Sequence, residues 1–162
     1  MKVVNYPFNP PIVEHSILQV EASLYNLDTE IGYLFDEDGN VVLRKEGTEK
    51  ELQFTPAELA QGVILTHYHT DNDSFTQDDI LVGIDHHYIE VRAVTDTHLY
   101  VVRFPEHYQG RKIDRLLTSS ADESSVPTAS LAVRPRHELW DKGHFGFFYF
   151  CGERDSINIP KW

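Results

Sequence analysis

Residues 63–80 read VILTHYHTDNDSFTQDDI. An apolar run typical of a strand ends in two histidines separated by one residue, and a polar loop then leads to an apolar segment that opens with two aspartates. Successive side chains in a strand point to opposite faces, so His67 and His69 share a face and can converge on one metal ion. A carboxylate from Asp78 or Asp79 would complete the ligand set. Two histidines, one carboxylate and an open position are the ligand count of a catalytic zinc site.

The segment after the histidines predicts a helix. Thr76 is the expected N-cap, and Asp78 and Asp79 fall in the first turn, where acidic side chains complement the helix dipole. A helix of about ten residues would then reach His86 or His87. Thr76 and the two aspartates therefore have a structural role open to them besides a role in a metal site.

The flanking segments alternate between strand and helix patterns. Apolar positions over residues 13–27 fit one helical face, and DGN at residues 38–40 between two apolar runs predicts a hairpin. TPAE at residues 55–58 combines an N-cap, a proline at the first helical position and a glutamate at the third, which predicts a short helix. Residues 88–105 read as a second hairpin that turns near residues 96–97. This alternation indicates an α/β layer structure.

The remaining segments are assigned from composition. Prolines cluster near the start of the chain, and we expect residues 1–12 to form an extended lead-in to a single domain over residues 13–162. Residues 110–142 are poorly readable and include a serine-rich stretch, so we expect a loop-rich region. The aromatic run at residues 146–151 predicts a buried strand with Cys151 in the core.

Composition and charge limit the classes of function and partner that we expect. The 162 residues suffice for one domain with a sizeable core. The formal net charge of −12 disfavours a nucleic-acid partner, because proteins that bind the phosphate backbone usually carry a basic patch. No apolar run reaches the length of a membrane span, so no membrane partner is expected, and the first residues do not read as a signal peptide. The single cysteine excludes an internal disulfide and a cysteine-based zinc cluster and favours a cytoplasmic location.

Three short motifs occur in a fixed order: EIG at residues 30–32, THYH at residues 66–69 and TQDD at residues 76–79. This order resembles the JAMM metalloprotein family, also called JAB or MPN-plus, and in particular its RadC-like and phage-associated bacterial members. The family pattern has a glutamate shortly before a glycine at a strand start, a strand ending in His-x-His-Pro, and Ser-x-x-Asp at a helix start. The resemblance covers residues 27–80.

The resemblance implies a fold and a chemistry. The fold would be the cytidine-deaminase-like JAB/MPN domain, a three-layer arrangement with a mixed central sheet flanked by helices. Zn²⁺ would be held by His67, His69 and Asp79 and would activate a water molecule. Glu30 would act as general base, and Thr76 would donate a hydrogen bond to the oxyanion. The expected reaction is hydrolysis of an amide or isopeptide bond in a peptide or protein-conjugate substrate.

Two departures from the family pattern keep a second function open. Thr70 stands where the family has proline, and Thr76 stands where it has serine, although Ser74 offers another hydroxyl nearby. The alternative is a catalytically inactive JAB-like binding or assembly module, of phage or mobile-element origin. Asp85 is a further candidate, as a hydrogen-bond partner for a ligand histidine.

Overall fold

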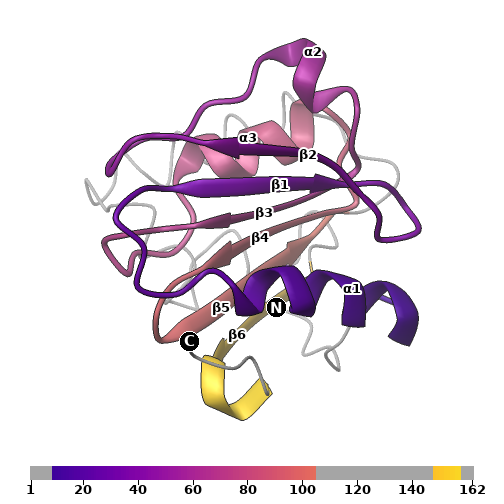
Figure 1. Ribbon diagram of the computed structural model, residues 1–162. Helices are drawn as coiled ribbons and strands as arrows, with labels where there is room; N and C mark the ends of the chain where they lie inside the picture. The colour runs from indigo at the N-terminus through magenta and orange to yellow at the C-terminus, as the bar shows by residue number, and fades with distance from the viewer. Residues whose placement is uncertain (1–8, 105–147, 158–162) are drawn as a thin grey trace, which may run out of the picture.

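The computed structural model describes residues 9–104 and 148–157. These residues form one six-stranded sheet in the order β2-β1-β3-β4-β5-β6 (Figure 1). Neighbouring strands are antiparallel except β3 and β4, which are parallel. The protein is therefore a mixed α/β fold, as its alternating pattern predicts. The strands are β1 Ile31–Phe35, β2 Val41–Glu46, β3 Ile64–Tyr68, β4 Glu90–Val94, β5 His98–Arg103 and β6 Phe148–Glu153.

Helices cover both faces of the sheet. Figure 1 shows α1 on one side of the strands and α3 on the other. Ile17 of α1 packs in a cluster with Ile64, whereas Ile80 of α3 packs in a separate cluster with Leu65. The helices are α1 Pro11–Ala22, α2 Pro56–Leu59, α3 Gln77–Asp85 and the short 3₁₀ helix η1 Arg154–Ile157. None of the helices in the described ranges has the length and apolar character needed to cross a membrane.

The local signals in the sequence place most elements correctly. Both predicted hairpins are present, and Gly39 adopts a φ of 84° in the turn between β1 and β2, a conformation that glycine adopts without strain. Thr55 and Glu58 form the predicted capping box of α2. Helix α3 begins after its N-cap Thr76 and ends at Asp85, close to the expected end.

The bounds of the first helix differ from the prediction. Helix α1 starts at Pro11, inside the expected lead-in, because a proline at the first helical position lacks only an N–H that would have no partner inside the helix. It ends at Ala22 rather than near residue 27, and Asn26 beyond it has a left-handed φ of 53°. Residues 1–8, as well as the predicted loop-rich region 110–142, lie outside the described residues.

The predicted burial of the last strand is wrong for Cys151. This side chain is exposed, while Phe150 is half-buried against the cluster on the α1 side of the sheet. Strand β6 stands at the end of the strand order and pairs with β5 alone among the described strands. Cys151 lies opposite Tyr100 of β5, on the other face from Phe150, and the described helices do not bury it there.

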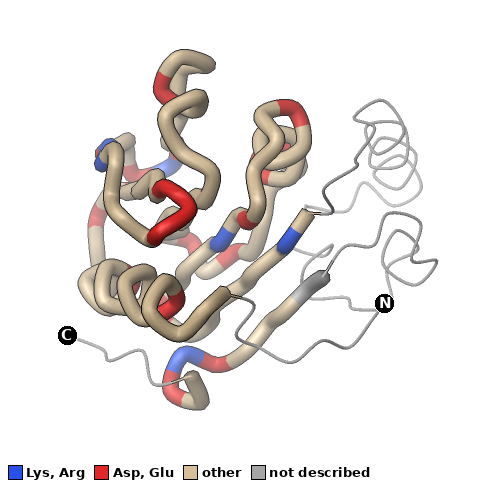
Figure 2. The backbone as a smooth tube through the Cα atoms, turned by 90° about the vertical axis from the view of Figure 1, so that its right-hand side faces the viewer, with Lys and Arg blue, Asp and Glu red and all other residues tan. Residues whose placement is uncertain are grey.

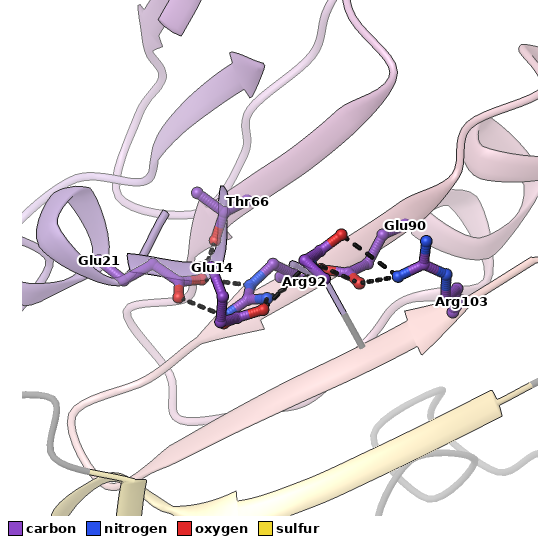
Figure 3. A network of polar contacts seen from close by, with 7 residues as sticks. Glu14, Glu21, Thr66, Glu90, Arg92 and Arg103 are labelled. Atoms are coloured by element: carbon purple, nitrogen blue, oxygen red, sulfur yellow. Dashed lines mark hydrogen bonds and ion pairs between the residues drawn. The ribbon is translucent and has the colours of Figure 1, made fainter. Parts of the chain in front are cut away.

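A buried polar network joins α1 to the sheet (Figure 3). The guanidinium of Arg92 donates hydrogen bonds to the carboxylates of Glu14, Glu21 and Glu90 over 2.7–3.1 Å. The Thr66 hydroxyl also donates to Glu21, at 2.6 Å. Burial favours the neutral form of Glu90 and raises its pKa, even though the Arg92 charge acts in the opposite direction. This network fixes α1 on the face of β3 and β4 opposite to His67.

Candidate metal centre

Three side chains from separate positions in the sequence meet at the carboxyl end of β3. His67 Nε2 lies 3.0 Å from Asp79 Oδ2, and His69 Nε2 lies 3.5 Å from the same oxygen. The two imidazole rings are 4.4 Å apart between centroids. The donor atoms of all three residues lie within 4.8 Å of one another, so the group could hold a metal ion. Of the two candidate aspartates, it is Asp79 whose carboxylate joins the histidines.

The sheet register creates the space for this group. His67 lies opposite Gly32 of β1 on one side and Ala93 of β4 on the other. Both neighbours are small, so the imidazole has room above the sheet. A methyl group at Gly32 would approach Leu52 Cδ2 to 2.6 Å and Phe54 Cζ to 2.8 Å, because the segment over residues 48–54 packs directly on this glycine. The glycine of the EIG motif therefore permits the close approach of a loop to the site.

The start of α3 places the third candidate ligand. Thr76 Oγ1 accepts a hydrogen bond from the Asp79 N–H at 3.1 Å, and Asp79 Oδ2 accepts one from the Thr76 N–H at 2.8 Å. This reciprocal capping box holds the Asp79 carboxylate at the helix N-terminus, facing the two histidines. The structural and the metal-binding interpretations of Asp79 are thus compatible, since the same carboxylate oxygen faces the N-cap N–H and both imidazoles.

The two histidines differ in their hydrogen bonds. The main-chain carbonyl of Asp73 accepts a 2.8 Å hydrogen bond from His69 Nδ1, which leaves Nε2 directed toward Asp79. Residue His67 is only 4% exposed, and neither of its ring nitrogens makes a well-aligned hydrogen bond with a described residue, although Nε2 lies 3.0 Å from Asp79 Oδ2 as an ion-pair contact. A buried polar atom without such a partner is costly, and coordination to a metal ion would satisfy it. These observations fit a metal ligand set.

The electrostatics reflect this close grouping. Burial by itself would raise the pKa of Asp79, but the charges and close contacts of His67 and His69 outweigh it and hold that pKa well below its usual range. Burial also tends to lower the pKa of His69, but the hydrogen bond and charge of Asp79 raise it to about 9. In the metal-free protein the carboxylate is therefore ionised, and His69 is protonated at neutral pH.

Glu30 lies beside the group, immediately before β1. It precedes by two residues the Gly32 that pairs with His67, and it is close enough to His69 and His67 for their charges to affect its pKa. Glu30 is half-buried and lines the same cleft as the three ligands. Burial raises its pKa, partly offset by the positive charges of His69 and His67. A carboxylate whose proton affinity is raised in this way is suited to accept and return a proton.

The cleft in front of these residues has a volume of about 440 Å³. Ser74 and Thr76, the two candidate oxyanion donors, both line it. Ser74 is fully buried, whereas Thr76 is exposed and caps α3. Residues 50–54 form the wall opposite α3. All five predicted site residues therefore border one cavity.

Two other predictions concern the surroundings of the histidines. Asp85 is exposed at the far end of α3 and does not line the cleft, so it is not the partner of a ligand histidine; the Asp73 carbonyl has that place. Thr70, which the resemblance places where the JAMM family has proline, donates a hydrogen bond of 2.5 Å to the Glu49 carbonyl. This bond ties the turn after His69 to the loop that covers the site.

The sequence gives no signal for two contributors to the site. The Asp73 carbonyl is a main-chain group, and any residue type could supply it. Residues 50–54 line the cleft because of the path of the long loop before α2, and no local sequence pattern predicts that path.

Comparisons of the chain with protein-family models, with curated proteins and with solved structures find no significant match.

Proposed function

We propose that this protein is a zinc-dependent metallopeptidase or isopeptidase of the JAMM type, with a JAB/MPN-like domain. The observation that carries the proposal is the convergence of Glu30, His67, His69 and Asp79 on one cleft. The motifs supply these residues in the order of the family, and the mixed sheet between helices agrees with the expected layer arrangement. Two imidazoles and one carboxylate with an open position are one of the ligand sets of catalytic zinc sites.

The residues around the cleft divide the chemistry among them. When bound, a zinc ion supplies Lewis acidity and lowers the pKa of a coordinated water to about 7. Glu30, which lines the cleft beside the candidate ligands, takes the proton from the attacking water and passes it to the leaving amine. Ser74 or Thr76 donates a hydrogen bond to the oxygen of the scissile carbonyl as negative charge develops there. The Asp73 carbonyl keeps His69 oriented throughout.

The departures from the family pattern have local compensation. The Thr70 side chain anchors the turn after His69 through its bond to Glu49, a restraint that the family obtains from proline. Thr76 retains the hydroxyl and serves as N-cap of α3. Neither substitution removes a ligand or the general base, and for this reason the active hydrolase is favoured over an inactive module.

The decisive experiment combines zinc analysis with a variant of Glu30. Wild-type protein should bind one zinc ion and cleave a member of a panel of fluorogenic peptides and protein conjugates, with activity lost to a chelator and restored by zinc. Glu30→Gln should keep the zinc and reduce kcat by roughly 10²–10⁴-fold, because it removes the proton carrier and no ligand. His67→Ala should lose the zinc.

The matched control is Glu37→Gln, which changes an exposed glutamate in the turn between β1 and β2. It should leave both zinc content and kcat unchanged. Zinc binding without cleavage of any panel member would contradict the hydrolase and identify an inactive binding module. A protein that takes up no zinc, with His67→Ala indistinguishable from wild type, would contradict the metal site itself.

A further inference from the structure

The rim of the cleft carries an excess of negative charge beyond the proposed reaction centre. Four carboxylates line the cleft without belonging to the ligand set or acting as the base, and they face one ammonium group, that of Lys50. The rim therefore has a formal charge of −3. The four are Glu51, Asp71, Asp73 and Asp78.

None of these four carboxylates forms an ion pair with a lysine or arginine of the described residues. All four residues are exposed. Asp71 is close enough to Glu30 for its charge to affect the pKa of that carboxyl. The negative field therefore extends from the rim to the proposed reaction centre. Figure 2 shows how acidic positions outnumber basic ones along the described backbone.

A bound divalent ion would not neutralise this rim. Its two positive charges would be balanced by the carboxylates of Asp79 and Glu30, which lie next to it, so the outer four would remain uncompensated. The buried His67 side chain, whose ring nitrogens have no hydrogen-bond partner among the described residues, also lines the cleft. His67 is also one of the three candidate metal ligands, so the cleft reaches the candidate metal centre.

Part of the cleft lining is apolar. Leu52 and Phe54 from the covering loop and Phe75 and Val82 from the α3 side all contribute to its lining. Leu52 and Phe54 are half-buried, so part of each side chain remains available for contact. A ligand that fills the cleft must therefore offer an apolar group as well as a group that suits a negative rim.

We propose that the cleft selects a peptide segment with a lysine or arginine side chain next to the scissile bond and an apolar side chain beside it. This inference rests on the proposed hydrolase function, since it names the substrate class of the same site. The basic side chain of the peptide would reach the rim carboxylates, while its apolar side chain packs on the apolar part of the cleft lining. An acidic peptide would be repelled, so the rim would act mainly on selectivity.

Binding of short peptides tests the proposal without requiring turnover. The probes are three fluorescein-labelled octapeptides that share a leucine and differ at the next position, which is lysine, norleucine or glutamate. The receptor is zinc-loaded Glu30→Gln protein, and fluorescence anisotropy gives each Kd. The lysine peptide should bind roughly tenfold more tightly than the glutamate peptide at low salt, and the ratio should shrink at higher ionic strength.

Two pairs of substitutions made in this receptor separate the rim from the overall charge. Glu51→Gln with Asp78→Asn should reduce the preference for lysine by about threefold or more, because two of four rim charges are lost. Glu37→Gln with Asp85→Asn removes the same two charges from exposed positions outside the cleft and should leave the preference unchanged. Asp85 is the matched control for Asp78, since both belong to α3.

The possible results separate this inference from the proposed function. A lysine preference that depends on Glu51 and Asp78 supports the inferred selectivity of the cleft. If wild-type protein then cleaves no substrate, the hydrolase proposal fails and the selectivity remains a property of peptide binding. Equal binding of the three peptides, no binding of any, or an equal effect of the control pair overturns it. Cleavage of a panel substrate with no preference for lysine would overturn the inference and leave the hydrolase standing.

Discussion

Adjacent residues of β3 serve opposite faces of the sheet. Thr66 points toward α1 and donates to Glu21, whereas His67 points toward α3 and faces Asp79. Because side chains alternate along the strand, the side chain of His69 lies on the same face as that of His67. A shift of one residue in the register of β3 would therefore bury Thr66 in the metal site and move His67 into the ion-pair network.

The metal-free protein should lose stability as the pH rises through the pKa of His69. The folded-state pKa of about 9 exceeds the ordinary value near 6.5, so protonation of His69 stabilises the folded state fully below about pH 6.5 and progressively less up to pH 9. We expect the free energy of unfolding in chelator to fall by about 3 kcal/mol over this range. Urea unfolding at a series of pH values measures it.

The control for this pH dependence is His69→Gln, which removes the titrating group and should flatten the profile between pH 6.5 and 9. His15, an exposed histidine of α1, is the matched comparison, and His15→Gln should leave the slope unchanged. A slope that persists in His69→Gln would assign the effect to another group and contradict the Asp79–His69 pairing as its cause.

The site could be predicted from the sequence to the extent that its signals are local. His67 and His69 follow from strand alternation, and Asp79 lies at a position fixed by the N-cap Thr76. The sequence alone does not distinguish Asp78 from Asp79. The side chains of adjacent helical residues point in different directions, and the exact start of the helix decides which carboxylate faces the histidines. The Asp73 carbonyl has no side-chain signature at all.

At the scale of elements, the short helices and hairpins were predictable and the contacts between distant elements were not. Capping residues and the DGN turn act within a few residues, and they fix α2, α3 and the β1–β2 hairpin. The partners Glu14 and Arg92 are 78 residues apart in the sequence, and no spacing rule connects them. The exposure of Cys151 likewise depends on which strand ends the sheet.

The network around Arg92 should contribute strongly to stability. Arg92→Lys keeps the positive charge but loses the planar fork that reaches Glu14, Glu21 and Glu90 together. We expect the free energy of unfolding to fall by about 3 kcal/mol, because buried carboxylates lose charged hydrogen bonds. Chemical denaturation with urea, followed by circular dichroism, provides the measurement.

Arg44→Lys is the matched control, since the Arg44–Glu46 pair is 3.9 Å apart and half-exposed on β2. Its effect should stay within about 0.5 kcal/mol, as expected for a surface ion pair. If Arg92→Lys costs no more than this control, the network does not hold α1 on the sheet, and the apolar contacts of Val13 and Ile17 would have to do so.

For the whole molecule, β3 carries two independent anchoring sites on its two faces. The α1 face holds an ion-pair network that is complete with protein groups alone, whereas the α3 face holds a histidine whose ring nitrogens have no hydrogen-bond partner among the described residues. The first arrangement serves stability, and the second could hold a metal ion. A metal ion that binds only the folded chain would stabilise the entire domain by mass action.

This division predicts that a weakened network leaves metal affinity intact. Glu21→Gln removes the negative charge of the carboxylate that accepts hydrogen bonds from Arg92 and Thr66. We expect it to lower the free energy of unfolding by about 2 kcal/mol. The loss should be the same, within about 0.5 kcal/mol, with zinc and with chelator, because effects at sites without shared partners add. The zinc Kd from competition with a chelating dye should then stay within about threefold of wild type, since 0.5 kcal/mol corresponds to little more than a twofold change in Kd. A Kd weakened tenfold or more would show that Thr66 transmits strain to His67, and that the two faces of β3 form one coupled unit.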